Sequence, residues 1–366
     1  MIKEGKFGTH EAICLVTITI TAKMFFTSPG ILADILGTAT WYMTLLSAAA
    51  AAVGFTFIYL LLKRFPGKNL VEAFEASLGR FCGFIFSFLL TQLFILNASA
   101  IIREFVEVLK VYVLPLTPIS FLIGIFVAVV TVVSFLGLET IARYAKMSAY
   151  ILLVSFITVL ILASQKYETY RMFPIFGYGL AKTIRHGLAR SSFYGEVLIL
   201  AVVAGSLQGT KYIKKAGYLS LVLSGILVSS ALLAFTLTFP YYTGAEITAP
   251  MYQLTAMIDY GRFLQRLEPI FLFIWFVSSF LSVTAIFYTS ASLYCKIFRI
   301  QDIRPIIFPF ANILFTVAMM PSDITTVATG YIHIFREYGW TILYIPPLIA
   351  LIIAIIREKA VTKQNV

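Results

Sequence analysis

The chain has 366 residues, of which 60% are hydrophobic and only 12% are charged, and its mean hydropathy is +0.92. Soluble globular proteins carry about twice that share of charged residues, so the composition excludes a soluble protein and indicates an integral membrane protein. The formal net charge of +11 is explained by basic residues near the ends of membrane spans, with a share for contact to anionic lipid. It is not evidence for nucleic-acid binding.

Apolar runs long enough to cross about 30 Å of hydrocarbon recur along the whole chain. They predict ten transmembrane helices in a single membrane domain covering residues 1–366, and the first span is expected to be retained because no cleavage site of small residues accompanies it. The predicted spans are 12–36, 40–62, 82–110, 118–137, 147–164, 189–208, 216–239, 269–296, 305–321 and 338–356.

Lys23 lies well inside the first predicted span, far from either end. A lysine near the middle of a bilayer costs about 3 kcal/mol or more unless it faces a polar cavity or a partner. Snorkelling of the side chain toward the interface suits helix ends and does not suit this position. Lys23 is therefore predicted to mark a substrate or ion pathway.

The third span and the connection between the fourth and fifth spans carry further polar residues. Asn97 is deep enough in the third span to line a cavity. Arg103 and Glu107 are four residues apart, a spacing that allows an ion pair on one helix face, and an ion-pair cluster in an outer vestibule is expected there. Glu139 and Arg143 have the same spacing and predict a salt bridge at the opposite surface.

Two loops on the side away from the termini contain helix-like patterns. Residues 178–188 have a basic amphipathic pattern that suits the membrane interface, and residues 251–264 form a helix-like run that could cap a central vestibule.

Glu196 lies in the sixth predicted span, directly after Gly195. A glycine beside a carboxylate allows the backbone to unwind, which a membrane tolerates only beside a cavity or other protein. The spans divide into two halves of five, at about 11–165 and 188–357, and an odd number of spans inverts the second half relative to the first. Lys23 and Glu196 then occupy the first helix of each inverted repeat, where transporters of this kind break their helices and bind ligands.

Lysine and arginine are more numerous on the side of the membrane that carries both termini than on the opposite side. Arg103, Arg190 and Arg336 are assigned to the opposite side. Because basic residues are retained in the cytoplasm, both termini are predicted to be cytoplasmic. The three histidines have no metal-ligand spacing, the three cysteines form no disulfide framework, and no phosphate-binding loop is found. The sequence therefore predicts no enzyme, no metal and no cofactor.

An ordered set of short motifs resembles the endospore germination permeases, the B subunits of nutrient germinant receptors. The motifs are Lys23-Met24-Phe25 with Ser28-Pro29-Gly30, Arg64-Phe65-Pro66-Gly67-Lys68, Gly137-Leu138-Glu139-Thr140-Ile141-Ala142-Arg143, Phe193-Tyr194-Gly195-Glu196, and Arg266-Leu267-Glu268 followed by Trp275. The family belongs to the amino acid-polyamine-organocation superfamily. The resemblance implies an all-α membrane fold of the LeuT type, with ten helices in a five-plus-five inverted repeat and breaks in helices 1 and 6.

The resemblance also implies that these two breaks hold a small ligand. With Asn97, the expected ligand-binding residues are Thr21, Ala22, Lys23, Met24, Thr27, Asn97, Phe193, Tyr194, Gly195 and Glu196.

Lys23 could act in two ways. Its ammonium could replace a sodium ion that related folds hold between helices 1 and 8, using Ser278, Ser279 and Ser282 of the eighth span. Alternatively, Lys23 could pair with Glu196 across the cavity as a latch that a zwitterionic ligand opens. The first role is preferred because it needs only hydroxyl and carbonyl groups.

The resemblance favours a receptor subunit that binds a small germinant, an amino acid by expectation, in the inner membrane of the spore and signals to the A and C subunits. The same pocket would serve an active secondary transporter of amino acids or other small polar nutrients, or a conduit for water or ions. The sequence does not separate these functions.

Overall fold

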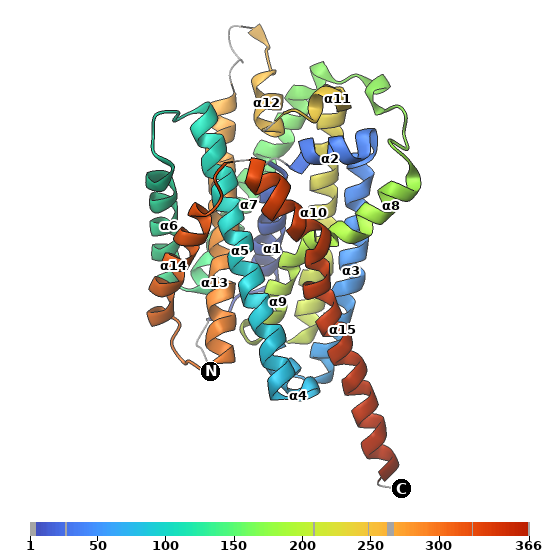
Figure 1. Ribbon diagram of the computed structural model, residues 1–366, viewed down its shortest axis with the longest axis vertical. Helices are drawn as coiled ribbons and strands as arrows, with labels where there is room; N and C mark the ends of the chain where they lie inside the picture. Colours follow the sequence, from blue (N-terminus) through green and yellow to red (C-terminus); the bar gives the residue numbers. More distant parts are fainter. Residues whose placement is uncertain are drawn as a thin grey trace.

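The computed structural model describes residues 5–25, 28–207, 209–247, 249–261, 267–323 and 325–364, which fold into an all-helical bundle (Figure 1). The first part of the chain forms α1 (Thr9–Thr21), η1 (Ala22–Phe25), α2 (Ser28–Leu36), η2 (Gly37–Ala39), α3 (Thr40–Arg64), α4 (Leu70–Leu78), α5 (Arg80–Tyr112), α6 (Ile119–Phe135) and α7 (Leu138–Ala163). The connection to the second part contains η3 (Ser164–Lys166), η4 (Thr169–Met172) and α8 (Leu180–Ala189).

The second part forms η5 (Arg190–Leu198), α9 (Ile199–Val202), η6 (Ala204–Ser206), α10 (Thr210–Thr238), α11 (Tyr241–Gly244), α12 (Pro250–Ala256), α13 (Glu268–Ile297), α14 (Arg304–Met319), η8 (Thr326–Ile332) and α15 (His333–Gln364). Helix α1 begins and α15 ends at the same end of the bundle (Figure 1).

Six helical segments of the described chain are long and apolar enough to cross a membrane: 28–64, 80–112, 138–166, 210–238, 268–297 and 330–357. Helices α6 and α14 are shorter apolar helices. The predicted spans 12–36 and 189–208 are each divided into short helical pieces, so neither forms one continuous helix. Multiple membrane crossing is thus evident, and the count of ten spans stays a prediction.

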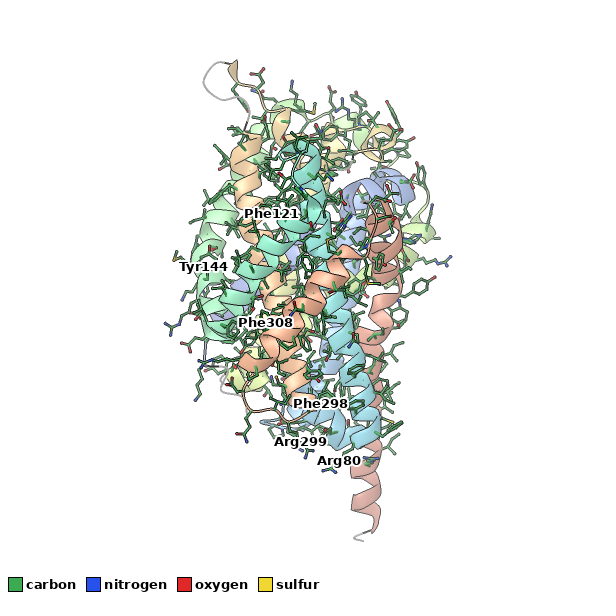
Figure 2. All side chains as sticks on the ribbon, turned by 60° about the vertical axis from the view of Figure 1, so that its left-hand side comes forward. Arg80, Phe121, Tyr144, Phe298, Arg299 and Phe308 are labelled. Carbon is green, nitrogen blue, oxygen red and sulfur yellow. The ribbon has the colours of Figure 1, made fainter. Side chains whose placement is uncertain are left out.

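The outer surface of the bundle is apolar, as contact with lipid requires. Phe121 on α6 and Phe308 on α14 point outward (Figure 2) and are 60% and 65% exposed. Arg80 and Arg299 lie instead at one end of the bundle (Figure 2), where charged groups can reach water. A soluble protein rarely leaves so much apolar surface uncovered.

The core forms around α1 and α13. Helix α13 packs against α5, α10 packs against α3, and α1 lies against α7, α10 and α13. Trp275 of α13 is fully buried, and its ring meets those of Phe25 from η1 and Phe105 from α5. These contacts join the first helix break to the centre of the bundle.

Several predicted boundaries differ from the structure, among them the start of α10 and both ends of α15, and two of the differences have a clear origin. Helix α7 begins at Leu138, nine residues before the predicted start, because Leu138, Ile141 and Ala145 bury an apolar stripe beyond the apolar run itself. Helix α12 ends at Ala256, so the helical run expected over 251–264 is shorter; residues 262–266 lie outside the described chain. Gly137, with φ +90°, lets α7 follow α6 with almost no connecting loop.

The contact between α3 and α10 depends on a glycine. A Cβ atom at Gly217 would lie 2.1 Å from the ring of Phe55, which is fully buried. We predict that Gly217→Ala lowers the free energy of unfolding by about 1–3 kcal/mol, because the core is overpacked. The melting temperature of purified protein measures this. Gly124→Ala on α6, where the nearest atom is 3.9 Å away, is the matched control and should not destabilise.

Candidate functional site

The first helix is interrupted at Lys23. Helix α1 ends at Thr21, residues 22–25 form the 3₁₀ segment η1, and α2 begins at Ser28. Thr27, one of the predicted site residues, lies outside the described residues. Lys23 is 1% exposed, so its ammonium must find partners within the protein.

The second interruption carries Glu196. It lies in η5, a 3₁₀ segment of nine residues, whereas 3₁₀ runs longer than three or four residues are uncommon and often mark a functional hinge. A Cβ atom at Gly195 would lie 2.5 Å from Leu343, so glycine is what lets η5 approach α15 closely. Glu196 is 1% exposed.

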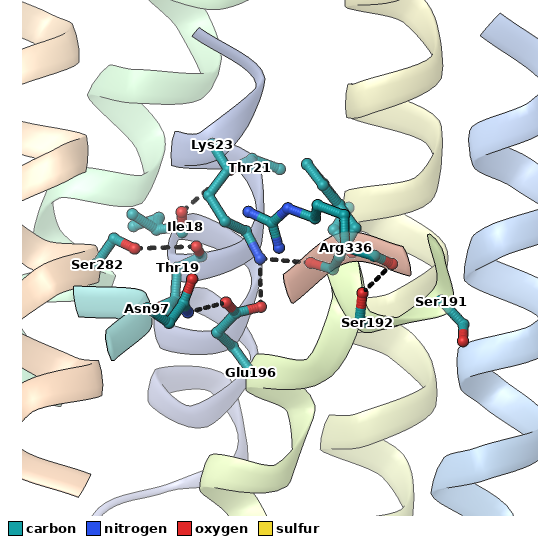
Figure 3. Close-up of polar contacts among 12 residues, drawn as sticks. Ile18, Thr19, Thr21, Lys23, Asn97, Ser191, Ser192, Glu196, Ser282 and Arg336 are labelled. Carbon is teal, nitrogen blue, oxygen red and sulfur yellow. Dashed lines mark hydrogen bonds and ion pairs between the residues drawn. The ribbon is translucent and has the colours of Figure 1, made fainter. Parts of the chain in front are cut away.

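The two interruptions meet through an ion pair. Lys23 Nζ donates to Glu196 Oε2 and to the carbonyl oxygen of Phe193 (Figure 3). The other carboxylate oxygen, Oε1, accepts from Asn97 Nδ2 of α5 at 2.8 Å. The ammonium also lies 4.6 Å from the centroid of the Phe193 ring. Three elements far apart in sequence are thereby joined by charged and polar side chains that water does not reach.

The other predicted site residues next to the two helix interruptions make contacts of their own and are not part of the ion pair. Thr21 Oγ1 donates to Thr17 O in its own helix, Ala22 is fully buried, and Met24 lines two cavities. The hydroxyl of Tyr194 donates to Thr44 O of α3 at 3.2 Å.

Among the residues that the structure describes, the serines of α13 make no hydrogen bond with Lys23. Ser282 Oγ donates to Thr19 O at 3.0 Å, beside the ion pair (Figure 3), and Ser278 lines an apolar groove. Ser279 Oγ is buried with no hydrogen-bond partner within the described chain. The structure thus brings Lys23 together with Glu196 and not with the three serines, and the sodium-like site stays a prediction.

Two further predicted ion pairs are confirmed. Arg103 and Glu107 pair at 2.7 Å along α5, and both side chains are buried. Glu139 and Arg143 pair at 2.5 Å on the surface of α7.

The structure adds an arginine that the sequence analysis assigned to the outer side. Arg336 on α15 is 4% exposed, and its guanidinium lies 4.8 Å from the Phe193 ring centroid. Its backbone carbonyl accepts from Ser192 Oγ at 2.8 Å. The residue precedes the predicted tenth span, which begins at 338, so apolar-run analysis left it outside the membrane. The apolar neighbours Ile332 and Phe335 were the available signal that the helix begins earlier.

Two cavities adjoin these residues. One, of about 190 Å³, lies between α5 and the region where η8 meets α15, and Asn97 and Arg336 line it. The other, of about 20 Å³, lies between η1, α3 and η5, and is large enough for only about one water molecule. A separate polar cavity of about 750 Å³ lies where α4, η6 and the end of α13 come together.

Comparison with known proteins identifies the family. The family model of the spore germination proteins matches residues 6–327. Spore germination protein KB of Bacillus subtilis (strain 168) is 21% identical, with 100% of this chain and 98% of that protein covered. Spore germination protein A2 of the same organism is 20% identical, with 98% of each covered. The chain belongs to the spore germination protein family.

Solved transporters have a similar fold. A Na⁺-coupled sialic acid symporter superposes with a TM-score of 0.68 at 12% identity, covering 96% of this chain and 89% of that one. A nucleobase-cation-symport-1 family transporter gives a TM-score of 0.61 at 13% identity, covering 99% and 94%. The family and these neighbours are permease-like, and the bundle has a transporter-like fold.

The buried pair generates a prediction about stability. Removing one partner leaves an uncompensated buried charge, which costs about 3–5 kcal/mol. We expect Lys23→Met and Glu196→Gln each to lower the melting temperature strongly. The double variant should recover much of the loss, because no buried charge is left without its partner. If the two losses add, the residues do not stabilise each other.

The α13 serines generate a second prediction. Ser278→Ala combined with Ser282→Ala should cost no more than about 1 kcal/mol, because it removes one hydrogen bond between helices. Melting temperatures of this variant and of Lys23→Ala, measured in sodium and in choline buffers of equal ionic strength, test the sodium-like site. Recovery of Lys23→Ala stability in sodium alone would contradict this expectation.

Proposed function

We propose that this chain is the transporter-like subunit of a spore nutrient germinant receptor. It binds a small germinant, an amino acid, beside the Lys23–Glu196 pair and signals the binding to partner subunits. The observation that carries the proposal is the buried ion pair between two interrupted helices, because such a contact is strong when closed and can be opened only by a ligand that replaces its charges.

The proposed mechanism is a shift between two states. In the closed state, Lys23 and Glu196 satisfy each other. A zwitterionic ligand offers an ammonium and a carboxylate, so it can compensate both residues when they separate. A ligand shifts the population only as far as it binds one state better than the other. An uncharged ligand would leave both buried charges without compensation.

The number of membrane spans and their repeat symmetry are part of the same proposal. Ten spans would form a LeuT-type inverted repeat over about 11–165 and 188–357, with η1 and η5 as the breaks of helices 1 and 6. The presence of one buried charge in each break supports this arrangement.

The proposed setting follows from the family. The partners are a small-molecule germinant and the A and C subunits of the receptor, and the membrane is the inner membrane of the spore with both termini on the core side. Helix α1 begins and α15 ends at the same end of the bundle, which supports the placement of both termini on one side of the membrane (Figure 1).

A second candidate function is active secondary transport of amino acids or other small polar nutrients. The fold likeness to symporters favours it. A passive conduit for water or ions uses the same cavities. Binding and uptake must therefore be measured separately.

We predict that purified protein in sealed vesicles binds its germinant without concentrating it. Glu196→Gln should weaken binding by about tenfold or more, since a desolvated charge contact contributes about 1.5–3 kcal/mol. Lys23→Met should abolish the germination response at equal abundance. Thermal shift with a nutrient panel measures binding, and radiolabelled uptake measures transport. Uptake above the leak of empty vesicles would favour the transporter, and an unchanged response of Lys23→Met would contradict the latch.

A further inference from the structure

Arg336 is the feature of the site that the ion pair does not use. Three arginines are buried in the described chain: Arg103, Arg190 and Arg336. Arg103 donates to Glu107 and to Ser322 O, and Arg190 donates to Glu337. Arg336 Nε and Nη1, in contrast, are buried and have no hydrogen-bond partner among the residues that the structure describes.

Buried N–H groups without an acceptor are costly, and a guanidinium always carries its charge. The Arg336 guanidinium is held in place by aromatic rings. The guanidinium lies against the rings of Phe193 and Phe335, with centroid distances of 4.8 and 5.2 Å. Figure 3 shows it in the same region of the bundle as the Lys23–Glu196 pair. Aromatic rings stabilise a cation without using its hydrogen-bond donors, so these contacts leave the N–H groups without an acceptor.

The space beside Arg336 fits a small molecule. The cavity of about 190 Å³ between α5 and α15 is lined by Arg336, Asn97 and Glu104, with apolar side chains such as Ile101 and Phe335. Pockets for drug-sized ligands measure about 300–1,000 Å³, so this cavity suits a smaller compound. Asn97 connects it to Glu196 by its 2.8 Å hydrogen bond.

The geometry points to Arg336 as the site for a ligand carboxylate. Planar guanidinium groups match carboxylates with two parallel N–H···O bonds, which a lysine cannot reproduce. We propose that a small monocarboxylate, an α-amino acid in the proposed function, binds in the cavity between α5 and α15 with its carboxylate on Arg336. The bound carboxylate supplies the acceptor that this guanidinium lacks, so in this refinement of the proposed function Arg336, and not Lys23, holds the ligand carboxylate, while Asn97 connects the cavity to Glu196. This inference rests on the proposed function for the identity of the ligand as a germinant.

The test compares acids with their amides on the purified full chain. The probes are the standard amino acids, propionate, lactate, glucose and inosine, each measured by thermal shift. For every acid that stabilises the protein, its primary amide is measured as well. The amide keeps the shape and loses the negative charge, so we expect it to bind the unaltered protein at least about tenfold more weakly.

Variants locate the effect. Arg336→Gln should weaken binding of the acid by about tenfold or more, and Arg336→Lys should recover only part of it. Both should leave binding of the amide nearly unchanged. Arg103→Gln, which removes a buried arginine that lines none of the described cavities, is the matched control and should keep the preference for the acid.

The outcomes separate the two proposals. Equal binding of acid and amide, or full binding of the acid by Arg336→Gln, overturns the role of Arg336 and leaves the proposed function standing. Stabilisation by glucose or inosine alone counts against both, because neither compound offers the charges that the Lys23–Glu196 pair requires. No stabilisation by any probe counts against both. If Arg336→Gln does not fold, Arg336→Lys, which keeps the charge, takes its place, and undiminished binding of the acid by Arg336→Lys overturns the role of Arg336.

Discussion

The structure depends on a buried ion pair in which neither charge is stable without the other. Lys23 and Glu196 are both 1% exposed, and each is held on a segment that has departed from regular α-helix. Either charge alone at this depth would cost several kcal/mol, so the two segments are held in register by the requirement that their charges meet. Asn97 extends the constraint to α5 by occupying the second carboxylate oxygen. A contact of this kind fixes one arrangement of three elements and makes any other arrangement require a substitute for both charges.

The irregular backbone around the pair follows from the same requirement. Regular helices would satisfy their backbone groups internally and point side chains at fixed angles. In η5 the backbone carbonyl oxygen of Phe193 accepts from the Lys23 ammonium of η1. The π-helical segment η8 directly precedes α15, where Arg336 lies. Each interruption thus carries or adjoins a buried charge, and such backbone is tolerated in a membrane only where protein or a cavity surrounds it.

The sequence predicts the membrane spans more completely than it predicts the contacts of the candidate site. Hydrophobic runs gave α3, α5 and α13 to within two residues at each end, because burial in lipid is a property of composition alone. They also identified Lys23 and Glu196 as charges inside such runs. Lys23 could have faced either the serines of α13 or Glu196. Which of the two it faces depends on how the interrupted helices are rotated relative to α13, and the sequence pattern does not determine that rotation. Arg336 was missed because a charge at the edge of an apolar run is typical of a membrane boundary. Only the packing of α15 against η5 draws the residue into the core.

The charges of the site bear on why sensing and transport use the same architecture. Glu196 is shared among Lys23, Asn97 and the field of Arg336, while the charge of Glu104 also acts on Arg336. Two cations and two carboxylates therefore lie near one another, and Lys23 and Glu196 are joined by a direct ion pair. In the proposed function, a small zwitterion that enters would redistribute these partners without changing the net charge of the core. In the proposed mechanism, signalling and release on the other side differ in how far η1 and η5 move afterwards. The chemistry that recognises the ligand is the same in both cases, so a transporter fold needs no new site to serve as a receptor.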